Sequence, residues 1–228
     1  ETAELYRKLY NSNSDKILVI PPLLNKIFLQ PVISQNSLFN HDAVVLLYVG
    51  GFHGTIRSPV HLLNLFEKLL KNPQMSGITL QLHFIGAEVG FIERELDKRP
   101  ILINRIFSHG RTSQTLAMQA MFEADLLINI GNSTSYQLPS KVVEYMATGK
   151  PILNITTIEN DTSSRKFQHY PLHFNWAVHG PNDLDGLCAF IKKNIGTAIP
   201  FEVVQTYVRD FTLNSIADRY LSAILKAN

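Results

Sequence analysis

The sequence predicts an α/β fold in which a Rossmann-like parallel sheet is flanked by helices. Apolar runs of strand length alternate with amphipathic runs of helix length along most of the 228 residues, which is the pattern of repeated βαβ units. Residues 43–49 form a continuous apolar run, as in strands that are buried on both faces. The composition, 45% hydrophobic and 18% charged, is that of a globular protein with a substantial core.

The first 41 residues are expected to lie outside this sheet. Residues 16–20 predict a short strand, and residues 23–41 have weak periodicity and predict a linker or an irregular cap. The chain begins without an initiator methionine, so we expect a piece of a longer protein. We divide it into a segment over residues 1–41 and an α/β domain over residues 42–228.

In the α/β domain, the first two expected strands end at glycines, and the expected helices carry apolar residues at helical spacing. The expected strands cover residues 43–49, 78–85, 101–107, 125–130, 151–155 and 174–178. The expected helices cover residues 58–70, 88–99, 112–122, 139–149, 183–194, 203–211 and 216–225. Thr112 is expected to cap the third of these helices, and residues 156–166 are expected to form a polar loop.

The block from Leu138 to Pro151 is the most informative part of the chain. A proline at its start and Gly149 at its end are typical helix boundaries. At about 100° per residue, four residues of this helix fall on one apolar face: Val142, Val143, Met146 and Ala147. With the strands on either side, the helix forms a βαβ unit, and its start lies where open α/β sheets bind phosphate groups.

The charge and the hydropathy pattern exclude several classes of protein. A formal net charge of +2 is too small to indicate nucleic-acid binding. It is compatible with contact to an anionic membrane surface, but it is more typical of an ordinary protein surface. No apolar run approaches the roughly 18 residues that would span a bilayer. Cys188 is the single cysteine, which excludes an internal disulfide, and its apolar neighbours predict a buried thiol.

Ligands of open parallel sheets bind beyond the carboxyl ends of the strands, which directs attention to four loops. In the first loop, Gly50 and Gly51 allow a ligand to approach the backbone closely, and Arg57 could pair with a phosphate. A tight turn with a solvated arginine explains the same residues equally well. The spacing lacks the G-x-G-x-x-G dinucleotide fingerprint, and the chain has no P-loop.

The second loop begins at Gly86, and the third contains His109 and Gly110. For the third loop, a base or a ribose lying against its backbone is one interpretation. A glycine turn followed by a helix cap is the other. His109 by itself is more typical of a surface or capping histidine than of a catalyst.

The fourth loop, residues 131–137, leads into the helix that carries Lys141 and Glu144. Free backbone amides at the helix start, together with Lys141, would favour a diphosphate. Glu144 could accept hydrogen bonds from two vicinal ribose hydroxyls. The alternative is an exposed Lys141–Glu144 pair worth roughly 0.2–0.5 kcal/mol. Spacing alone favours this alternative, because solvated charged faces are commoner.

Several short blocks occur here in the order found in one enzyme family. They are Gly50-Gly51, Arg57-Ser58-Pro59 with the leucine-rich helix after it, Phe84-Ile85-Gly86, Ala124 to Ile128, and Pro139-Ser140-Lys141-x-x-Glu144-Tyr145-Met146-Ala147-Thr148-Gly149-Lys150-Pro151. From about Lys16 to its end, the chain resembles the C-terminal half of a GT-B glycosyltransferase of the group 1, family 4-like type. The block from Pro139 to Pro151 is quite specific, whereas each of the others is weak on its own.

In that family this half binds a nucleotide-activated sugar, usually a UDP- or GDP-sugar. The resemblance implies that Glu144 holds the ribose, that the first loop and Arg57 approach the diphosphate, and that residues 137–141 meet phosphate and sugar. The expected donor-binding residues are Gly50, Gly51, Arg57, Gly86, His109, Gly110, Gln137, Leu138, Ser140, Lys141 and Glu144.

Two departures from the family pattern bear on function. Many members have a second glutamate, eight residues before the ribose-binding one, that contacts the donor sugar; here that position is Tyr136. We also expect the acceptor-binding N-terminal half, which would supply a catalytic base, to be missing from this chain. Residues 1–22 resemble only its last helix and strand, and the terminal helices are expected to cross back to it.

The resemblance also implies a reaction without metal or cofactor, in which a helix dipole and basic residues stabilise the leaving diphosphate. Asp183-Leu184-Asp185 looks like the metal-binding Asp-x-Asp of the other glycosyltransferase fold, but its setting predicts a helix N-terminus. No cluster of histidine and cysteine suggests zinc. We therefore expect no metal site.

The resemblance thus implies the donor-binding domain of a hexosyltransferase that moves a sugar from a UDP- or GDP-sugar to a growing polysaccharide or a lipid-linked glycan, with retention of configuration. Alone, the domain should bind nucleotide and transfer nothing. We expect it in the cytoplasm or at the inner face of the membrane, without nucleic-acid partners. Two alternatives stay open: a non-catalytic Rossmann-like nucleotide-binding module, and half of a nucleotide-sugar epimerase.

Overall fold

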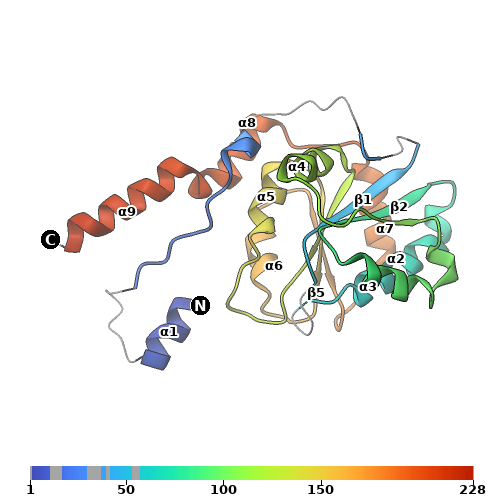
Figure 1. Cartoon of the computed structure of the whole chain (residues 1–228), viewed down its shortest axis with the longest axis horizontal. Coiled ribbons are helices and arrows are strands. Elements are labelled where there is room, and N and C mark those ends of the chain that lie inside the picture. Colours follow the sequence, from blue (N-terminus) through green and yellow to red (C-terminus); the bar gives the residue numbers. More distant parts are fainter. Residues whose placement is uncertain (1, 11–16, 30–36, 40–41, 53–56, 228) are drawn as a thin grey trace.

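The computed structural model describes residues 2–10, 17–29, 37–39, 42–52 and 57–227. Its centre is a six-stranded parallel sheet with the strand order β3-β2-β1-β4-β5-β6 (Figure 1). The strands are β1 (Val44–Val49), β2 (Leu80–Ile85), β3 (Ile106–Ser108), β4 (Leu126–Ile130), β5 (Ile152–Thr156) and β6 (His173–Ala177). The predicted Rossmann-like fold class is confirmed.

The strand order reverses at the centre of the sheet. β1 pairs with β2 on one side and with β4 on the other, and both pairs are parallel. The connections that follow β1 and β4 therefore leave in opposite directions, which makes the topological switch point at which such sheets bind ligands. Val49 lies opposite Ile85, and Tyr48 lies opposite Ile128. The loops after β1, β2 and β4 consequently emerge beside one another.

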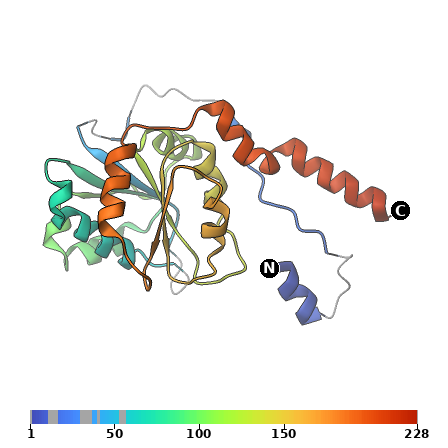
Figure 2. The same ribbon diagram turned by 180° about the vertical axis from the view of Figure 1, so that it is seen from behind.

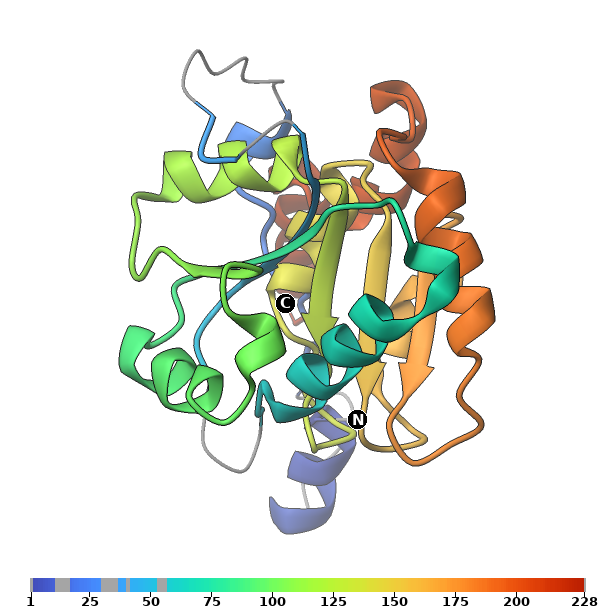
Figure 3. The ribbon, with the colours of Figure 1, turned by 90° about the vertical axis from the view of Figure 1, so that its right-hand side faces the viewer.

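Helices cover both faces of the sheet (Figures 2 and 3). One face carries α4 (Gln114–Glu123), α5 (Lys141–Ala147), α6 (Thr162–Phe167) and α8 (Phe201–Val208). The other face carries α2 (Val60–Lys71), α3 (Val89–Leu96) and α7 (Leu184–Asn194). The short turns η3 (Pro73–Met75), η4 (Pro100–Leu102) and η5 (Arg209–Phe211) follow α2, α3 and α8 in the chain.

The continuous apolar run of β1 follows from this double cover. Successive side chains of a strand point to opposite faces, so Leu47 and Val49 enter the core under α4 and α5, whereas Leu46 and Tyr48 enter the core under α2. All four are buried. The strand therefore has no polar face, as the sequence predicted.

Two predicted strands differ in the structure. Of residues 101–107, only the end belongs to a strand, β3, because Pro100 begins the turn η4 and Asn104 has a positive φ of 64° that interrupts extended backbone. Residues 17–20, the described part of the first predicted strand, form no strand. They run beside the domain, away from the edges of the sheet, where they have no strand to pair with (Figure 1).

Residues 156–166, predicted to be a polar loop, contain most of α6. Asp161 caps this helix by accepting a hydrogen bond from Ser164 N at 2.6 Å. A second correction concerns the cap of α4, which is Ser113 rather than Thr112, because Ser113 Oγ accepts from Leu116 N at 3.2 Å. Both helices begin at a polar side chain, but the capping residue cannot be chosen from a run of neighbouring polar residues.

The segment before β1 is not a simple linker. It contains η2 (Lys26–Leu29), and Leu24, Phe28 and Phe39 are buried in the core under α4 and α8. Leu24 N also donates to Phe211 O at 2.8 Å. The described part of residues 23–41 therefore belongs to the packing of the domain.

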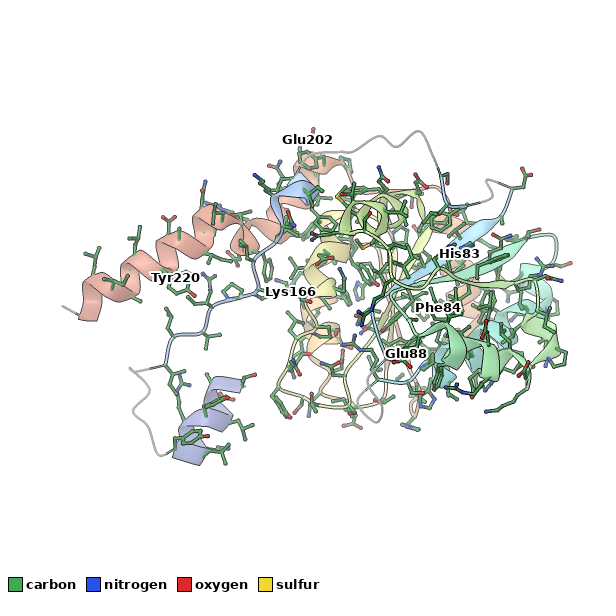
Figure 4. All side chains as sticks on the ribbon, in the orientation of Figure 1. His83, Phe84, Glu88, Lys166, Glu202 and Tyr220 are labelled. Atoms are coloured by element: carbon green, nitrogen blue, oxygen red, sulfur yellow. The ribbon has the colours of Figure 1, made fainter. Side chains whose placement is uncertain are left out.

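Two helices stand apart from the sheet. α1 (Thr2–Tyr10) and α9 (Leu213–Ala227) project to one side of the domain, and Tyr220 lies on the part of α9 that is clear of it (Figures 1 and 4). Their exposed large apolar residues are Leu5, Tyr6, Leu9, Tyr10, Leu213, Tyr220, Leu221, Ile224 and Leu225. In the described part of the chain, no helix is long and apolar enough to cross a membrane.

Candidate functional site

A cavity of about 340 Å³ opens at the carboxyl ends of β1 and β2, beside α4 and α5. It is lined by Phe28, Val49, Gly50, Gly51, Ile85, Gly86, Arg111, Thr112, Gln114, Ala117, Met121, Lys141 and Glu144. The cavity thus brings together predicted site residues from two loops and the helix α5: Gly50, Gly51, Gly86, Lys141 and Glu144. Its volume lies within the range of small-molecule sites.

Part of the cavity wall is bare backbone. Gly50 and Gly86 have φ values of 151° and 84°, which residues with a side chain rarely adopt. Gly50 N donates to Ile85 O at 2.9 Å, and Gly86 N donates to Gly110 O at 2.6 Å, so three successive loops lie against one another. A Cβ on Gly86 would lie 3.5 Å from the carbonyl oxygen of Gly50. Glycine allows the backbone itself to face the cavity.

Lys141 and Glu144 close the cavity from α5. Lys141 Nζ donates to Glu144 Oε2, and the two side chains are 29% and 19% exposed. The pair expected from the spacing therefore forms, but at a cavity rather than on a solvated face. Among the described residues only Lys141 bonds this carboxylate, which leaves Oε1 for a hydroxyl donor. The predicted apolar face of α5, on the opposite side, is fully buried.

Tyr145 joins α5 to the first loop, although the sequence did not indicate this role. Its hydroxyl oxygen accepts from Val49 N at 2.9 Å and its proton is donated to Val49 O at 3.3 Å. Burial raises the pKa of Tyr145 far above its ordinary value. The hydroxyl therefore stays protonated and holds the helical turn of Glu144 beside Gly50. In the sequence, a tyrosine on an apolar helix face cannot be distinguished from any other core aromatic.

Arg57 does not line the cavity but lies beside the first loop. Its Nη2 donates to Asn132 Oδ1 at 2.6 Å, and its Nε is buried without a partner among the described residues. Its charge is close to Tyr48, whose hydroxyl donates to Gly51 O at 3.0 Å. Burial raises the pKa of Tyr48, and the arginine offsets only part of that rise. Arg57 is thus held at the switch point, and its buried Nε has no acceptor among the described residues.

His109 and Gly110 stand behind the cavity wall. His109 Nε2 lies 2.9 Å from His83 Nδ1, and the two rings stack with centroids 5.2 Å apart. Burial lowers the pKa of both histidines, that of His83 to about 4. The next residues, Arg111 and Thr112, face the cavity instead. The half-buried imidazole of His109 therefore stacks on His83 and does not line the cavity.

Gln137 and Leu138 line a second cavity, of about 730 Å³, between α6, α1 and residues 17–22. Lys166 of α6 also lines it, and its amine lies 4.5 Å from the centroid of the Phe211 ring (Figure 4). Tyr136, which replaces the glutamate of the family pattern, is 42% exposed in the same wall.

The remaining predicted residue, Ser140, is exposed at the N-cap position of α5, where its side chain makes no capping bond. It lines neither cavity. The helix that follows it has only 7 residues. Of the residues in this helix, Lys141 and Glu144 line the first cavity.

The described residues contain no group of three or more His, Cys, Asp or Glu side chains that could hold a metal ion. Asp183 is the N-cap of α7, as its setting predicted, and accepts from Gly186 N at 2.7 Å. Cys188 is buried on the same helix, where burial raises the pKa of its thiol. Its burial agrees with the prediction of an inert core thiol.

Comparison of the sequence with protein-family models and with curated proteins gives no match. Comparison of the fold with solved structures gives several glycosyltransferases among its matches. The lipopolysaccharide outer core galactosyltransferase WaaB matches with a TM-score of 0.62 and 16% identity, over 99% of this chain and 60% of its own. A glycosyltransferase from Rickettsia africae matches with 0.67 and 16%, over 97% and 60%. HepE from Anabaena, in complex with UDP, matches with 0.56 and 18%, over 81% and 49%.

These likenesses show the fold. The chain has the architecture of one part of a glycosyltransferase, which confirms, at the level of the fold, the resemblance to GT-B enzymes. The narrower family 4-like assignment stays a prediction. The chain spans 60% or less of the length of these three structures.

Proposed function

We propose that this chain is the donor-binding domain of a glycosyltransferase that transfers a hexose from a UDP- or GDP-sugar to a growing polysaccharide or a lipid-linked glycan. The observation that carries the proposal is the cavity of about 340 Å³ at the switch point, with glycine backbone on one side and Glu144 on the other. Sheets of this topology bind nucleotides at that place. HepE, which shares the fold, was solved with UDP.

Each part of a nucleoside diphosphate has a matching group in this arrangement. The ribose lies against Glu144, whose Oε1 accepts a hydroxyl. The diphosphate lies over the backbone of Gly50 and Gly51, where Lys141 supplies positive charge from the cavity wall and Arg57 supplies it from beside the first loop. These cations stabilise the charge that develops on the leaving diphosphate, and they take the place of a metal ion. We expect the anomeric configuration to be retained.

Transfer also needs an acceptor, which we place on a second domain packed against α1 and α9. The support for this is that both helices expose several large apolar side chains, which are typical of protein–protein contact surfaces. A catalytic base would come from that domain. The chain alone should therefore bind nucleotide and transfer nothing.

Calorimetric titration of the chain with UDP, GDP and NAD tests the proposal. UDP or GDP should bind, NAD should not, and Glu144→Ala should weaken binding at least about tenfold because the ribose loses a charged acceptor. Glu67→Ala is the matched control, since Glu67 also pairs with a lysine of its own helix, Lys71, but lies on α2 away from the cavity. Failure of both UDP and GDP to bind, or full affinity of the Glu144 variant, would contradict the proposal.

A non-catalytic nucleotide-binding module is the second candidate. Tyr136 favours it, because a tyrosine at that position offers no carboxylate to the donor sugar and is exposed at the other cavity. The full reading frame separates the two candidates. A longer protein that contains a second α/β half and hydrolyses a UDP- or GDP-sugar supports the enzyme, whereas one that binds the nucleotide without turnover supports the module.

A further inference from the structure

One buried side chain, Asn132, joins the two loops that meet at the switch point. It follows β4 after Gly131 and is 3% exposed. Its Oδ1 accepts from Arg57 Nη2 at 2.6 Å, and its Nδ2 donates to the carbonyl of Gln137 at 3.2 Å. Because both ends of the carboxamide are used, its orientation is fixed.

The far end of this connection is also held. The carbonyl of Gln137 accepts a second bond, from Thr162 Oγ1 of α6, at 2.8 Å. The loop after β4 is therefore clamped where it returns toward α5. Through Asn132, this clamp extends across the sheet to Arg57 in the connection between β1 and α2.

Arg57 has binding capacity that the described residues do not use. Its Nε is buried and has no hydrogen-bond partner among the described residues, which is unfavourable for a guanidinium unless a further acceptor approaches. The hydroxyl of Tyr48 donates to Gly51 O, and the guanidinium of Arg57 lies close enough to this hydroxyl to offset part of the rise in its pKa. Tyr48 therefore lies between the arginine and the glycine backbone of the cavity wall. An anion at this place would satisfy the free donor with a charge-assisted bond.

A neutral carboxamide suits this position better than a carboxylate. An aspartate at position 132 would form an ion pair with Arg57, cancel its charge and repel a diphosphate. It would also lose the donor that holds the Gln137 carbonyl. The amide orients the arginine and leaves its charge intact.

We propose that Asn132 is a positioning residue of the donor site, which aims the Arg57 guanidinium at the diphosphate and fixes the loop after β4 through Gln137. This inference rests on the proposed function, since it presupposes that a nucleoside diphosphate binds at the switch point. It adds a residue that contacts no ligand itself and acts through Arg57.

Calorimetry with UDP and GDP, and with the nucleosides uridine and guanosine, tests the role of Asn132. Asn132→Ala should weaken binding of the diphosphate about tenfold and leave nucleoside binding unchanged, because only the phosphate contact is misaligned. Asn132→Asp should weaken diphosphate binding further, about a hundredfold, because it also cancels charge. If the alanine variant does not fold, the aspartate variant, which keeps the size of the side chain, carries the test.

A double-mutant cycle distinguishes positioning from general support of the fold. Arg57→Ala combined with Asn132→Ala should weaken diphosphate binding much less than the product of the two single effects, because Asn132 acts through Arg57. Asn129→Ala is the matched control. Asn129 lies in β4, the strand that leads into the loop of Asn132, is also 3% exposed and donates to Asn154 Oδ1 at 2.6 Å. It should lower stability without changing diphosphate affinity.

The outcomes separate the two proposals. If the natural chain binds neither UDP nor GDP, the proposed function fails and the role of Asn132 fails with it. If the natural chain binds a diphosphate but Asn132→Ala leaves its affinity unchanged, only the role of Asn132 is overturned. Equal loss of nucleoside and diphosphate affinity, or independent effects of the Arg57 and Asn132 changes, would overturn it as well.

Discussion

The two sides of the switch point are held together by different interactions. Beyond β1, β2 and β3, the loops lie backbone to backbone, and the first two of them face the cavity with glycine. In the sheet on the other side, Asn129, Asn154 and Asn175 lie directly opposite one another on β4, β5 and β6 and form a hydrogen-bonded ladder, in which the first two are buried and Asn175 is exposed. On the cavity side, neighbouring loops contact one another through backbone, whereas on the other side side-chain hydrogen bonds join neighbouring strands.

The ladder should depend most on its central member. Asn154 is fully buried, accepts from Asn129 and donates to Ser164 and Asn175 at 2.9 Å each. Asn154→Ala should lower the free energy of unfolding by about 3 kcal/mol, because it leaves several buried polar groups unpaired. Asn175→Ala, at the exposed end of the ladder, should cost about 0.5–1 kcal/mol. Urea unfolding of both variants measures the difference, and equal losses would contradict a ladder centred on Asn154.

On the glycine side, His83 makes stability depend on pH. Burial, and to a lesser degree His109, lower the pKa of His83 from 6.5 to about 4. Between these values the unfolded chain binds a proton that the folded chain does not, so stability falls as the pH decreases from 6.5 toward 4, by about 2–3 kcal/mol. Unfolding measured at several pH values should show this slope.

In the His83→Gln variant, the dependence of the unfolding free energy on pH should decrease by the equivalent of about one bound proton, because the titrating group is removed. His169→Gln, which replaces an exposed histidine, should keep it. An unchanged slope in the His83 variant would show that another group controls the acid sensitivity.

The smallest expected effect comes from alanine substitutions at two glycines, which distinguish backbone strain from a contribution to nucleotide binding. Gly86 and Gly77 have nearly equal positive φ values, 84° and 81°, but a Cβ on Gly86 would meet the backbone of Gly50, whereas one on Gly77 would meet nothing within 4 Å. Alanine at either position should cost about 1–2 kcal/mol of stability. Only Gly86→Ala should also weaken binding of UDP or GDP in calorimetry. Equal affinities in the two variants would mean that the Gly86 loop does not face the nucleotide.

The parts of the molecule that could be predicted from sequence are those with local patterns. The spacing of apolar residues identified α5 and its buried face, and the alternation of strands and helices identified the parallel sheet. Glu144 and Lys141 could be placed together because they are three residues apart on that helix.

The parts that could not be predicted depend on contacts between distant residues. Arg57 and Asn132 are 75 positions apart, and Val49 and Tyr145 are 96 apart, so neither pair leaves a local signal. The α6 helix was missed because its sequence, Thr162 to Phe167, has too few apolar residues for periodicity. Its one local signal was the capping residue Asp161, three positions before Ser164.

Backbone amide NMR during titration with UDP and GDP tests the central claim most directly. If a nucleoside diphosphate occupies the cavity at the switch point, the largest shifts should fall on the amides of Gly50, Gly51 and Gly86, and Glu144→Ala should reduce them at a given ligand concentration. Shifts centred on Leu138 and Lys166, which line the other cavity, or no shifts with either nucleotide, would contradict the account.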